Sequence, residues 1–225
     1  MGMVGRMRIR DAVTALVDLV LPADCAGCGA VEHPWCARCR EQLGGPTVAE
    51  LPGGPTVLAA GRYAGPLRSA LLRYKERGRR DLAGPLAELL AVPLDELIGP
   101  RWGTTWLVPA PSRAAAARVR GGDHVLRLCR TLSAQRTDLL VAHSLRLAQG
   151  AMDSVGLDAA QRAANLAGRV GVVGDLLPPP GARVVLVDDV VTTGSTLRAC
   201  RSALAGAGIV VRSAVTLCDA TVPKR

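Results

Sequence analysis

The sequence predicts an α/β fold, a mostly parallel sheet flanked by helices, with a small metal-binding module near the N-terminus. From residue 56 onward, short apolar segments alternate with longer segments of helical pattern, which is typical of parallel strands joined by crossover helices. The run Val184–Val187 has four consecutive apolar residues, as expected of a strand covered on both faces. Two Cys-x-x-Cys pairs between residues 25 and 39 indicate a separate metal-binding unit.

The composition limits what the core and the surface can be. A chain of 225 residues is long enough for one domain and a smaller module. It is 49% hydrophobic but has no Phe, three Trp and two Tyr, so its core must consist mainly of Val, Leu and Ala. The formal net charge of +9 has two interpretations. It indicates either a surface for nucleic acid or polyphosphate or arginines scattered over a solvated surface.

Residues 1–22 are expected to form an amphipathic helix that lies on the rest of the protein. The segment is basic and then apolar, like a secretion signal, but Asp11 and Asp18 interrupt it and no apolar run reaches membrane-spanning length. We therefore expect no membrane insertion and a cytoplasmic location. The apolar residues at helical spacing are Ile9, Val13, Leu16 and Val20.

Residues 23–45 are expected to form a zinc ribbon. Seven residues separate the pair Cys25 and Cys28 from the pair Cys36 and Cys39, and two such turns can direct four thiolates to one tetrahedral zinc ion. A redox pair or an accidental cluster are the alternatives. Four sulfur ligands leave no open coordination position, so the zinc would be structural and would supply folding energy to a segment too short for its own core.

The elements of the larger domain follow a linker rich in Gly and Pro at residues 46–55, and this domain is expected to span residues 56–225. The predicted strands are Thr56–Ala60, Thr104–Val108, Leu139–Ala142, Val184–Val187 and Ile209–Leu217. The predicted helices are two stretches within residues 61–92, separated at Gly78, followed by Gly122–Ala134, Asp158–Ala167 and Ser195–Ala205.

Two acidic residues, Asp188 and Asp189, stand at the end of the predicted central strand, where open α/β sheets bind ligands. The following residues, Thr192–Thr196, are small and polar and lead into a helix, so their backbone N–H groups and hydroxyls can surround a phosphate. The acids can accept hydrogen bonds from sugar hydroxyls or hold water on a magnesium ion. A ribose 5-phosphate fits both features. A Ser/Thr-capped helix after a buried strand is the alternative, and it leaves the two adjacent acids unexplained.

The stretch from Val184 to Thr196 reads VVLVDDVVTTGST, which resembles the signature with which type I phosphoribosyltransferases bind 5-phosphoribosyl 1-pyrophosphate (PRPP). The wider chain resembles the ComF family, which includes ComFC and GntX-type proteins, from about Leu16 to Leu217. The resemblance rests on the cysteine pairs and on the stretches YAGPLRSALLRYKERGRRDLA, LVPAPSRAAAARVRGGDH and GLDAAQRAANLAGRV. It implies a type I phosphoribosyltransferase fold with an N-terminal zinc-binding module.

The resemblance also implies site residues. Residues 148–168 would form a loop that closes over PRPP, with Arg162 acting in catalysis together with Asp188 and Asp189. ComF sequences usually have an aromatic residue and Asn after Arg-Gly, where this chain has Gly122-Asp123-His124. The implied PRPP-binding residues are Asp188, Asp189, Val190, Thr192, Thr193, Gly194, Ser195 and Thr196, and those of the pyrophosphate loop are Ala110, Ser112 and Arg113.

Two residues near these motifs, His124 and Lys75, are expected to have ordinary structural roles. A single histidine at the start of a helix, such as His124, is typically a cap or a surface residue. Lys75 is one of only two lysines and could meet a phosphate or a nucleic-acid backbone, but we expect it to be exposed.

Two functions from different classes follow from the sequence. The first is an enzyme that binds PRPP with Mg²⁺ and transfers its phosphoribosyl group to a nitrogen acceptor, releasing pyrophosphate. The second is a non-catalytic protein of competence and DNA uptake that binds single-stranded DNA or DNA-processing proteins. The scarcity of aromatic residues speaks against single-strand binding, which relies on stacking, although Trp35, Trp102 and Trp106 leave stacking open.

Overall fold

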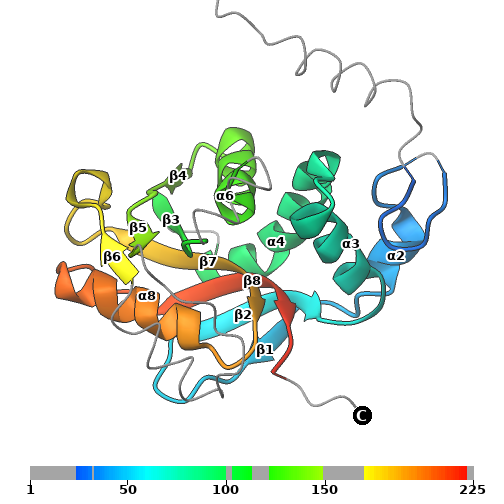
Figure 1. The fold of residues 1–225 in the computed structure, drawn as a ribbon. Helices are drawn as coiled ribbons and strands as arrows, with labels where there is room; N and C mark the ends of the chain where they lie inside the picture. The colour runs from blue at the N-terminus through cyan, green and yellow to red at the C-terminus, as the bar shows by residue number, and fades with distance from the viewer. Residues whose placement is uncertain (1–23, 32, 100–102, 113–121, 149–169, 222–225) are drawn as a thin grey trace, which may run out of the picture.

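The computed structural model describes residues 24–31, 33–99, 103–112, 122–148 and 170–221 (Figure 1). The expected helices at residues 1–22 and Asp158–Ala167 lie outside these residues. The strands are β1 (Thr47–Ala49), β2 (Thr56–Arg62), β3 (Thr105–Pro109), β4 (Leu139–Val141), β5 (Leu145–Leu147), β6 (Val170–Val172), β7 (Arg183–Val191) and β8 (Ser213–Asp219). The helices are α2 (Ala37–Glu41), α3 (Gly65–Glu76), α4 (Ala83–Ile98), α6 (His124–Gln135) and α8 (Ser195–Gly206), with 3-10 turns η1 (Arg80–Leu82) and η2 (Gly174–Leu176).

The predicted α/β fold is confirmed. Six strands form one sheet in the order β1-β2-β8-β7-β3-β4, and β5 and β6 form a separate antiparallel pair. Within the six-stranded sheet, β1 runs antiparallel to β2, and the other neighbours run parallel. Because parallel strands end at the same edge, the carboxyl ends of β2, β3, β7 and β8 lie together.

Helices cover both faces of the sheet (Figure 1). Val185 and Val187 of β7 belong to one buried cluster, together with apolar residues of α3, α4 and α6. Val184 and Leu186 alternate with them and belong to a second cluster, which includes residues of α8. This alternation explains why the four residues Val184–Val187 of β7 are all apolar. The largest fully buried side chains are leucines, as expected for a chain almost without aromatic residues.

The structure differs from the sequence prediction at several element boundaries. Strand β7 continues through both aspartates to Val191, because its pairing with β8 extends from Val185–Ser213 to Val191–Asp219. Residues 46–55, expected to be a linker, contain strand β1, which adds an antiparallel edge to β2. Strands β1, β5 and β6 have three residues each, too few to show a period of two in the sequence.

No helix among the described residues has the length and apolar character needed to cross a membrane.

Candidate functional site

The acidic pair lies near the carboxyl end of β7, with helices α3 and α6 packed beside it. Asp189 is buried, with 6% of its surface exposed, and Asp188 is half-buried. The backbone N–H of Asp189 donates a hydrogen bond of 2.8 Å to Oδ1 of Asp188. The two neighbouring carboxyl groups therefore have different surroundings.

Asp189 is held by side chains from two helices. Lys75 Nζ of α3 donates to Asp189 Oδ2 at 2.5 Å, and His124 Nε2 of α6 lies 2.8 Å from the same oxygen. Because an ionised carboxylate only accepts hydrogen bonds, the hydrogen of that contact lies on Nε2. Burial alone would raise the pKa of Asp189, but the hydrogen bond with His124 and the charge of Lys75 lower this pKa below its ordinary value.

Asp188 has the opposite electrostatic situation. Burial and the negative charge of Asp189 raise the pKa of Asp188 well above its ordinary value. No Lys, Arg or His of the described residues forms an ion pair with Asp188, whereas Asp189 has two such partners. The repulsion between adjacent acids is thus reduced in two ways: Asp189 is neutralised by a cation, and Asp188 retains its proton more strongly.

The expected surface positions of His124 and Lys75 were wrong. His124 is buried, with 4% of its surface exposed, and its carbonyl accepts a hydrogen bond from the hydroxyl of Tyr74. The cap of α6 is instead Asp123, whose carboxylate accepts hydrogen bonds from the amides of Val125 and Leu126. A signal for Lys75 was present: it follows the buried Leu67 and Leu71 at intervals of four residues, so it continues the same face of α3, where it is half-buried.

The predicted phosphate-binding turn, Thr192–Thr196, connects β7 to α8. Gly194 has a φ of +71°, a conformation that favours glycine, and a Cβ there would lie 2.5 Å from a methyl of Leu51. No side chain caps the amino end of α8, and Arg198 of its first turn donates to the carbonyl of Thr193. Backbone N–H groups, hydroxyls and one cation thus meet at this turn.

The predicted pyrophosphate loop begins where β3 ends. The N–H of Ala110 donates to the carbonyl of Val187 at 2.7 Å, which attaches this loop to β7 one residue before the acidic pair. The amide and hydroxyl of Ser112 both donate to Asp123, so Ser112 is tied to the start of α6. Beside it lies a hollow of about 330 Å³ whose lining includes His143 and Arg146. Two further predicted residues, Arg113 and Arg162, lie outside the described residues.

The sulfur atoms of Cys25, Cys28, Cys36 and Cys39 all lie within 4.8 Å of one another. The distance between sulfurs is 3.7 Å for Cys25 and Cys39 and 3.6 Å for Cys28 and Cys36. Tetrahedral zinc with Zn–S bonds of about 2.3 Å places its sulfurs about 3.8 Å apart, so this donor set fits zinc.

The pKa values of Cys28 and Cys39 are shifted in opposite directions, because backbone hydrogen bonds favour the thiolate of Cys28 and burial favours the thiol of Cys39. A hydrogen bond from the backbone of Ala30 is the main cause that lowers the pKa of Cys28 to about 6, and the amide of Cys36 donates to Sγ of Cys25. Gly27 lies against the cluster, since a Cβ at this residue would be 2.6 Å from Sγ of Cys39. The knuckle thus has no room for a larger residue.

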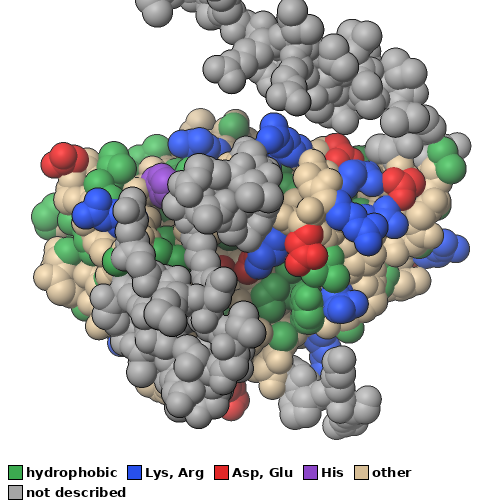
Figure 2. Space-filling model, viewed as in Figure 1, with side chains coloured by type: hydrophobic (Ala, Val, Ile, Leu, Met, Phe, Trp, Pro, Cys, Tyr) green, Lys and Arg blue, Asp and Glu red, His purple; other side chains and the backbone are tan. Residues whose placement is uncertain are grey.

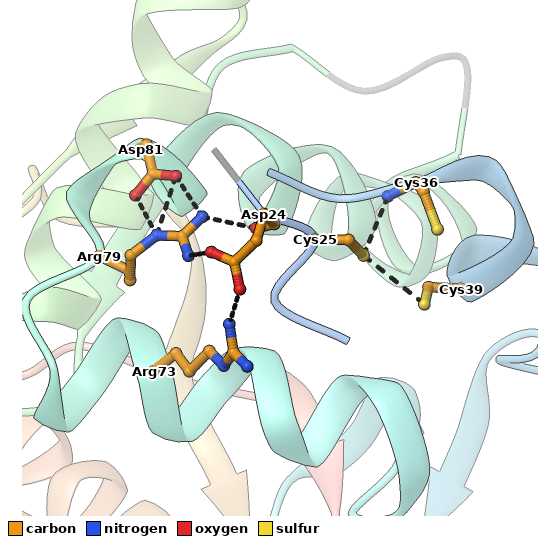
Figure 3. Close-up of polar contacts among 7 residues, drawn as sticks. All are labelled: Asp24, Cys25, Cys36, Cys39, Arg73, Arg79 and Asp81. Carbon is orange, nitrogen blue, oxygen red and sulfur yellow. Dashed lines mark hydrogen bonds and ion pairs between the residues drawn. The ribbon is translucent and has the colours of Figure 1, made fainter. Parts of the chain in front are cut away.

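The cysteine module is attached to the larger domain by ion pairs (Figure 3). The carboxylate of Asp24 accepts from Arg73 of α3 at 2.5 Å and from Arg79 at 2.6 Å, and Arg79 also donates to the carbonyl of Asp24 and to Asp81. The hydrogen bond with Arg73 is the main cause that lowers the pKa of Asp24. Figure 2 shows basic and acidic side chains side by side over α2 and α3.

The module also shares a hydrophobic core with the larger domain. Cys25, Ala26, Trp35 and Cys39 are buried in the same cluster as the apolar faces of α3 and α4. Zinc at the four cysteines would therefore order side chains that belong to the main core.

Comparison with known proteins bears on the carboxyl-terminal part of the chain. Residues 146–224 match the family model described as phosphoribosyl transferase domain, and this segment contains the acidic pair and the turn that follows it. The carboxyl-terminal third is similar to a phosphoribosyl transferase domain. The search of curated proteins gave no match.

Several solved hypoxanthine phosphoribosyltransferases align with this chain at low structural similarity. A mutant from Trypanosoma cruzi in a ternary substrates complex has 18% identity and a TM-score of 0.33, covering 67% of this chain and 74% of that one. An enzyme from Staphylococcus aureus has 18% identity and a TM-score of 0.35, covering 65% and 69%. A third, an asparagine mutant from an analysis of an invariant aspartic acid in these enzymes, has 18% identity and a TM-score of 0.34, covering 67% and 72%.

The raised pKa of Asp188 predicts a pH-dependent stability. A group whose pKa is higher in the folded than in the unfolded state stabilises the fold below its unfolded pKa of about 3.9, and this contribution is lost as the pH rises. Asp188→Asn is therefore expected to raise the free energy of unfolding at about pH 8 and to change it little at about pH 4. Urea denaturation at both pH values measures this. An equal effect at both values would contradict the prediction.

The double ion pair of Asp24 predicts a moderate contribution to stability. Asp24→Ala is expected to lower the free energy of unfolding by about 1 kcal/mol, because Asp24 is half-exposed but meets two arginines. Glu88→Ala is the matched control, since the exposure of Glu88 is similar and it has one arginine partner. Its expected effect is below about 0.5 kcal/mol. Equal losses in urea denaturation would show that the second arginine adds nothing.

The close approach of Gly27 to the cysteine cluster predicts a loss of metal on substitution. The purified protein is expected to contain about one zinc ion per chain, and Gly27→Ala to lower both the zinc content and the melting temperature. Gly103→Ala, where a Cβ would meet nothing within 4 Å, is the control. Mass spectrometry of the metal content measures the effect, and wild-type protein purified without zinc would refute the assignment.

Proposed function

We propose that this protein binds PRPP and transfers its 5-phosphoribosyl group to a nitrogen acceptor with release of pyrophosphate, as a member of the ComF family that its sequence resembles. One observation carries the proposal: a single strand, β7, contains the acidic pair and leads directly into the predicted phosphate-binding turn. This strand lies within the segment that matches the phosphoribosyl transferase domain.

The sugar phosphate would occupy the carboxyl end of β7. The turn Thr192–Thr196 would receive the 5-phosphate, because the uncapped amino end of α8 presents backbone N–H groups and the turn supplies hydroxyls. The acidic pair would accept hydrogen bonds from the ribose hydroxyls, which is the natural role of carboxylates next to a sugar. Because the acidic pair and the turn follow one another along the same strand, the strand fixes the distance between the ribose contact and the phosphate contact.

The pyrophosphate would occupy the region after β3. The loop with Ala110, Ser112 and Arg113 follows β3, and β3 pairs directly with β7. Asp188 offers a half-buried carboxyl group at this edge of the sheet, whose oxygens are of the hard type that Mg²⁺ prefers. Bound magnesium would neutralise charge on the pyrophosphate. Arg113 and Arg162 would add positive charge to the leaving group.

The reaction is a substitution at C1 of the ribose. The lone pair of the acceptor nitrogen forms the new bond to C1, the bond from C1 to oxygen breaks, and pyrophosphate leaves with the bonding electrons. The nitrogen releases its proton to solvent. The chain contributes by orienting the two reactants and by stabilising the charge of the leaving group.

In this proposal the four cysteines hold a structural zinc ion, and the protein acts in the cytoplasm. DNA binding remains a prediction from the sequence. Trp35 is not available for base stacking, because it is buried in the main hydrophobic cluster with 6% of its surface exposed. Trp102 lies outside the described residues.

The test is calorimetric titration of zinc-loaded protein with PRPP, with and without Mg²⁺. Asp188→Asn is expected to weaken PRPP binding about 10- to 150-fold, because hydrogen bonds to a charged group contribute about 1.5–3 kcal/mol. Asp175→Asn, an exposed acid on η2, is the control and should bind like the wild type. Absence of PRPP binding by folded wild-type protein, or equal binding by Asp188→Asn, would refute the proposal.

A further inference from the structure

The surroundings of Asp189 contain two side chains to which neither the sequence motifs nor the family match assigns a role. Lys75 comes from α3, 114 residues away in sequence, and His124 from α6, 65 residues away. Both contact the same oxygen, Oδ2, at 2.5 and 2.8 Å. A third group, the backbone N–H of Val190, donates to the other oxygen at 2.8 Å.

These contacts use most of the hydrogen-bonding capacity of Asp189. A carboxylate oxygen has two lone pairs, so Lys75 and His124 together occupy Oδ2, and one position on Oδ1 remains. The residue is also buried, with 6% of its surface exposed. Asp189 therefore has little capacity left for a ligand's hydroxyls, whereas the half-buried Asp188 forms no ion pair among the described residues.

The charges of the site also indicate that Asp188, and not Asp189, contacts the ligand. A ligand with a phosphate and a pyrophosphate is strongly anionic, and two ionised carboxylates beside it would repel it. Lys75 cancels the charge of Asp189 through a direct ion pair. One cation is thus placed where it makes the acidic pair compatible with an anionic ligand.

We propose that Lys75 and His124 are positioning residues that hold Asp189 as a buried, ionised anchor, so that Asp188 alone of the pair meets the ligand's hydroxyls. The inference rests on the proposed function, because it assigns the contacts of the same phosphoribosyl ligand. It distinguishes two acids that sequence motifs treat alike. Asp189 acts on binding only through the position of β7 and of Asp188.

The test is a double-mutant cycle with Asp189→Asn, Lys75→Met and the combination of both. If Asp189 is an anchor, the double mutant lacks both charges and is expected to bind PRPP within about threefold of the wild type. Lys75→Met alone leaves Asp189 without its lysine cation, with only the contact to His124, and is expected to weaken PRPP binding about tenfold. If Asp189 contacts the ligand directly, the double mutant will lose as much affinity as Asp188→Asn, which would overturn the proposal.

Conservative variants separate positioning from general loss of structure. Lys75→Arg retains the cation and is expected to restore most of the affinity lost in Lys75→Met. His124→Gln retains a donor near the position of Nε2 and is expected to bind better than His124→Leu. Arg77→Met is the control on α3, because Arg77 is exposed at the end of this helix. Equal affinity of Lys75→Met and Arg77→Met would overturn the role of Lys75.

The anchoring role of Asp189 can also be tested without any ligand. The free energy of unfolding is measured for the wild type, Asp189→Asn, Lys75→Met and the double mutant. A coupled pair predicts that the double mutant is less destabilised than the sum of the two single mutants, because each single mutant removes one charge of the ion pair and leaves the other. If the two single mutants lower the free energy of unfolding additively, the proposed role of Lys75 in holding Asp189 is overturned, even if the protein binds PRPP. Failure of the wild type to bind PRPP would refute the proposed function, while strong coupling in stability would still support the anchor.

Discussion

The contact between Lys75 and Asp189 is the interaction on which the arrangement of this site depends. A carboxylate in a buried strand loses its hydration, and a second carboxylate next to it adds repulsion. The fold meets this cost with a cation from α3 and an imidazole from α6, both on one oxygen of Asp189. Helices α3 and α6 must therefore pack beside the carboxyl end of β7. Strand β7, held between β3 and β8, can then continue through both acids.

Helix α3 connects this site to the cysteine module. Lys75 near its carboxyl end reaches the acidic pair, and Arg73, two residues earlier, binds Asp24 immediately before the first cysteine. The apolar side of the same helix, with Leu67 and Leu71, lies in the cluster that also contains Cys25 and Cys39. Metal binding and the position of the acidic pair thus involve one helix, and the module is part of the main core.

Features that suit a ligand are individually unfavourable for folding. Two adjacent acids repel each other, Gly194 has a backbone conformation that other residues rarely adopt, and the amino end of α8 has no side-chain cap. The parallel sheet compensates, because β7 is paired along both edges and its valines and Leu186 are buried on both faces. Stability supplied by the centre of the sheet therefore maintains a polar edge.

The sequence by itself determined the features that depend on neighbouring residues. The spacing of the four cysteines, the apolar run of β7 and the turn after it are local patterns, and they predicted the α/β fold and the thiolate cluster. Only the tertiary structure decided that Asp189 is paired and Asp188 is not, because Lys75 and His124 are 114 and 65 residues away from Asp189. No local period encodes such contacts, since they arise from how α3 and α6 pack against the sheet.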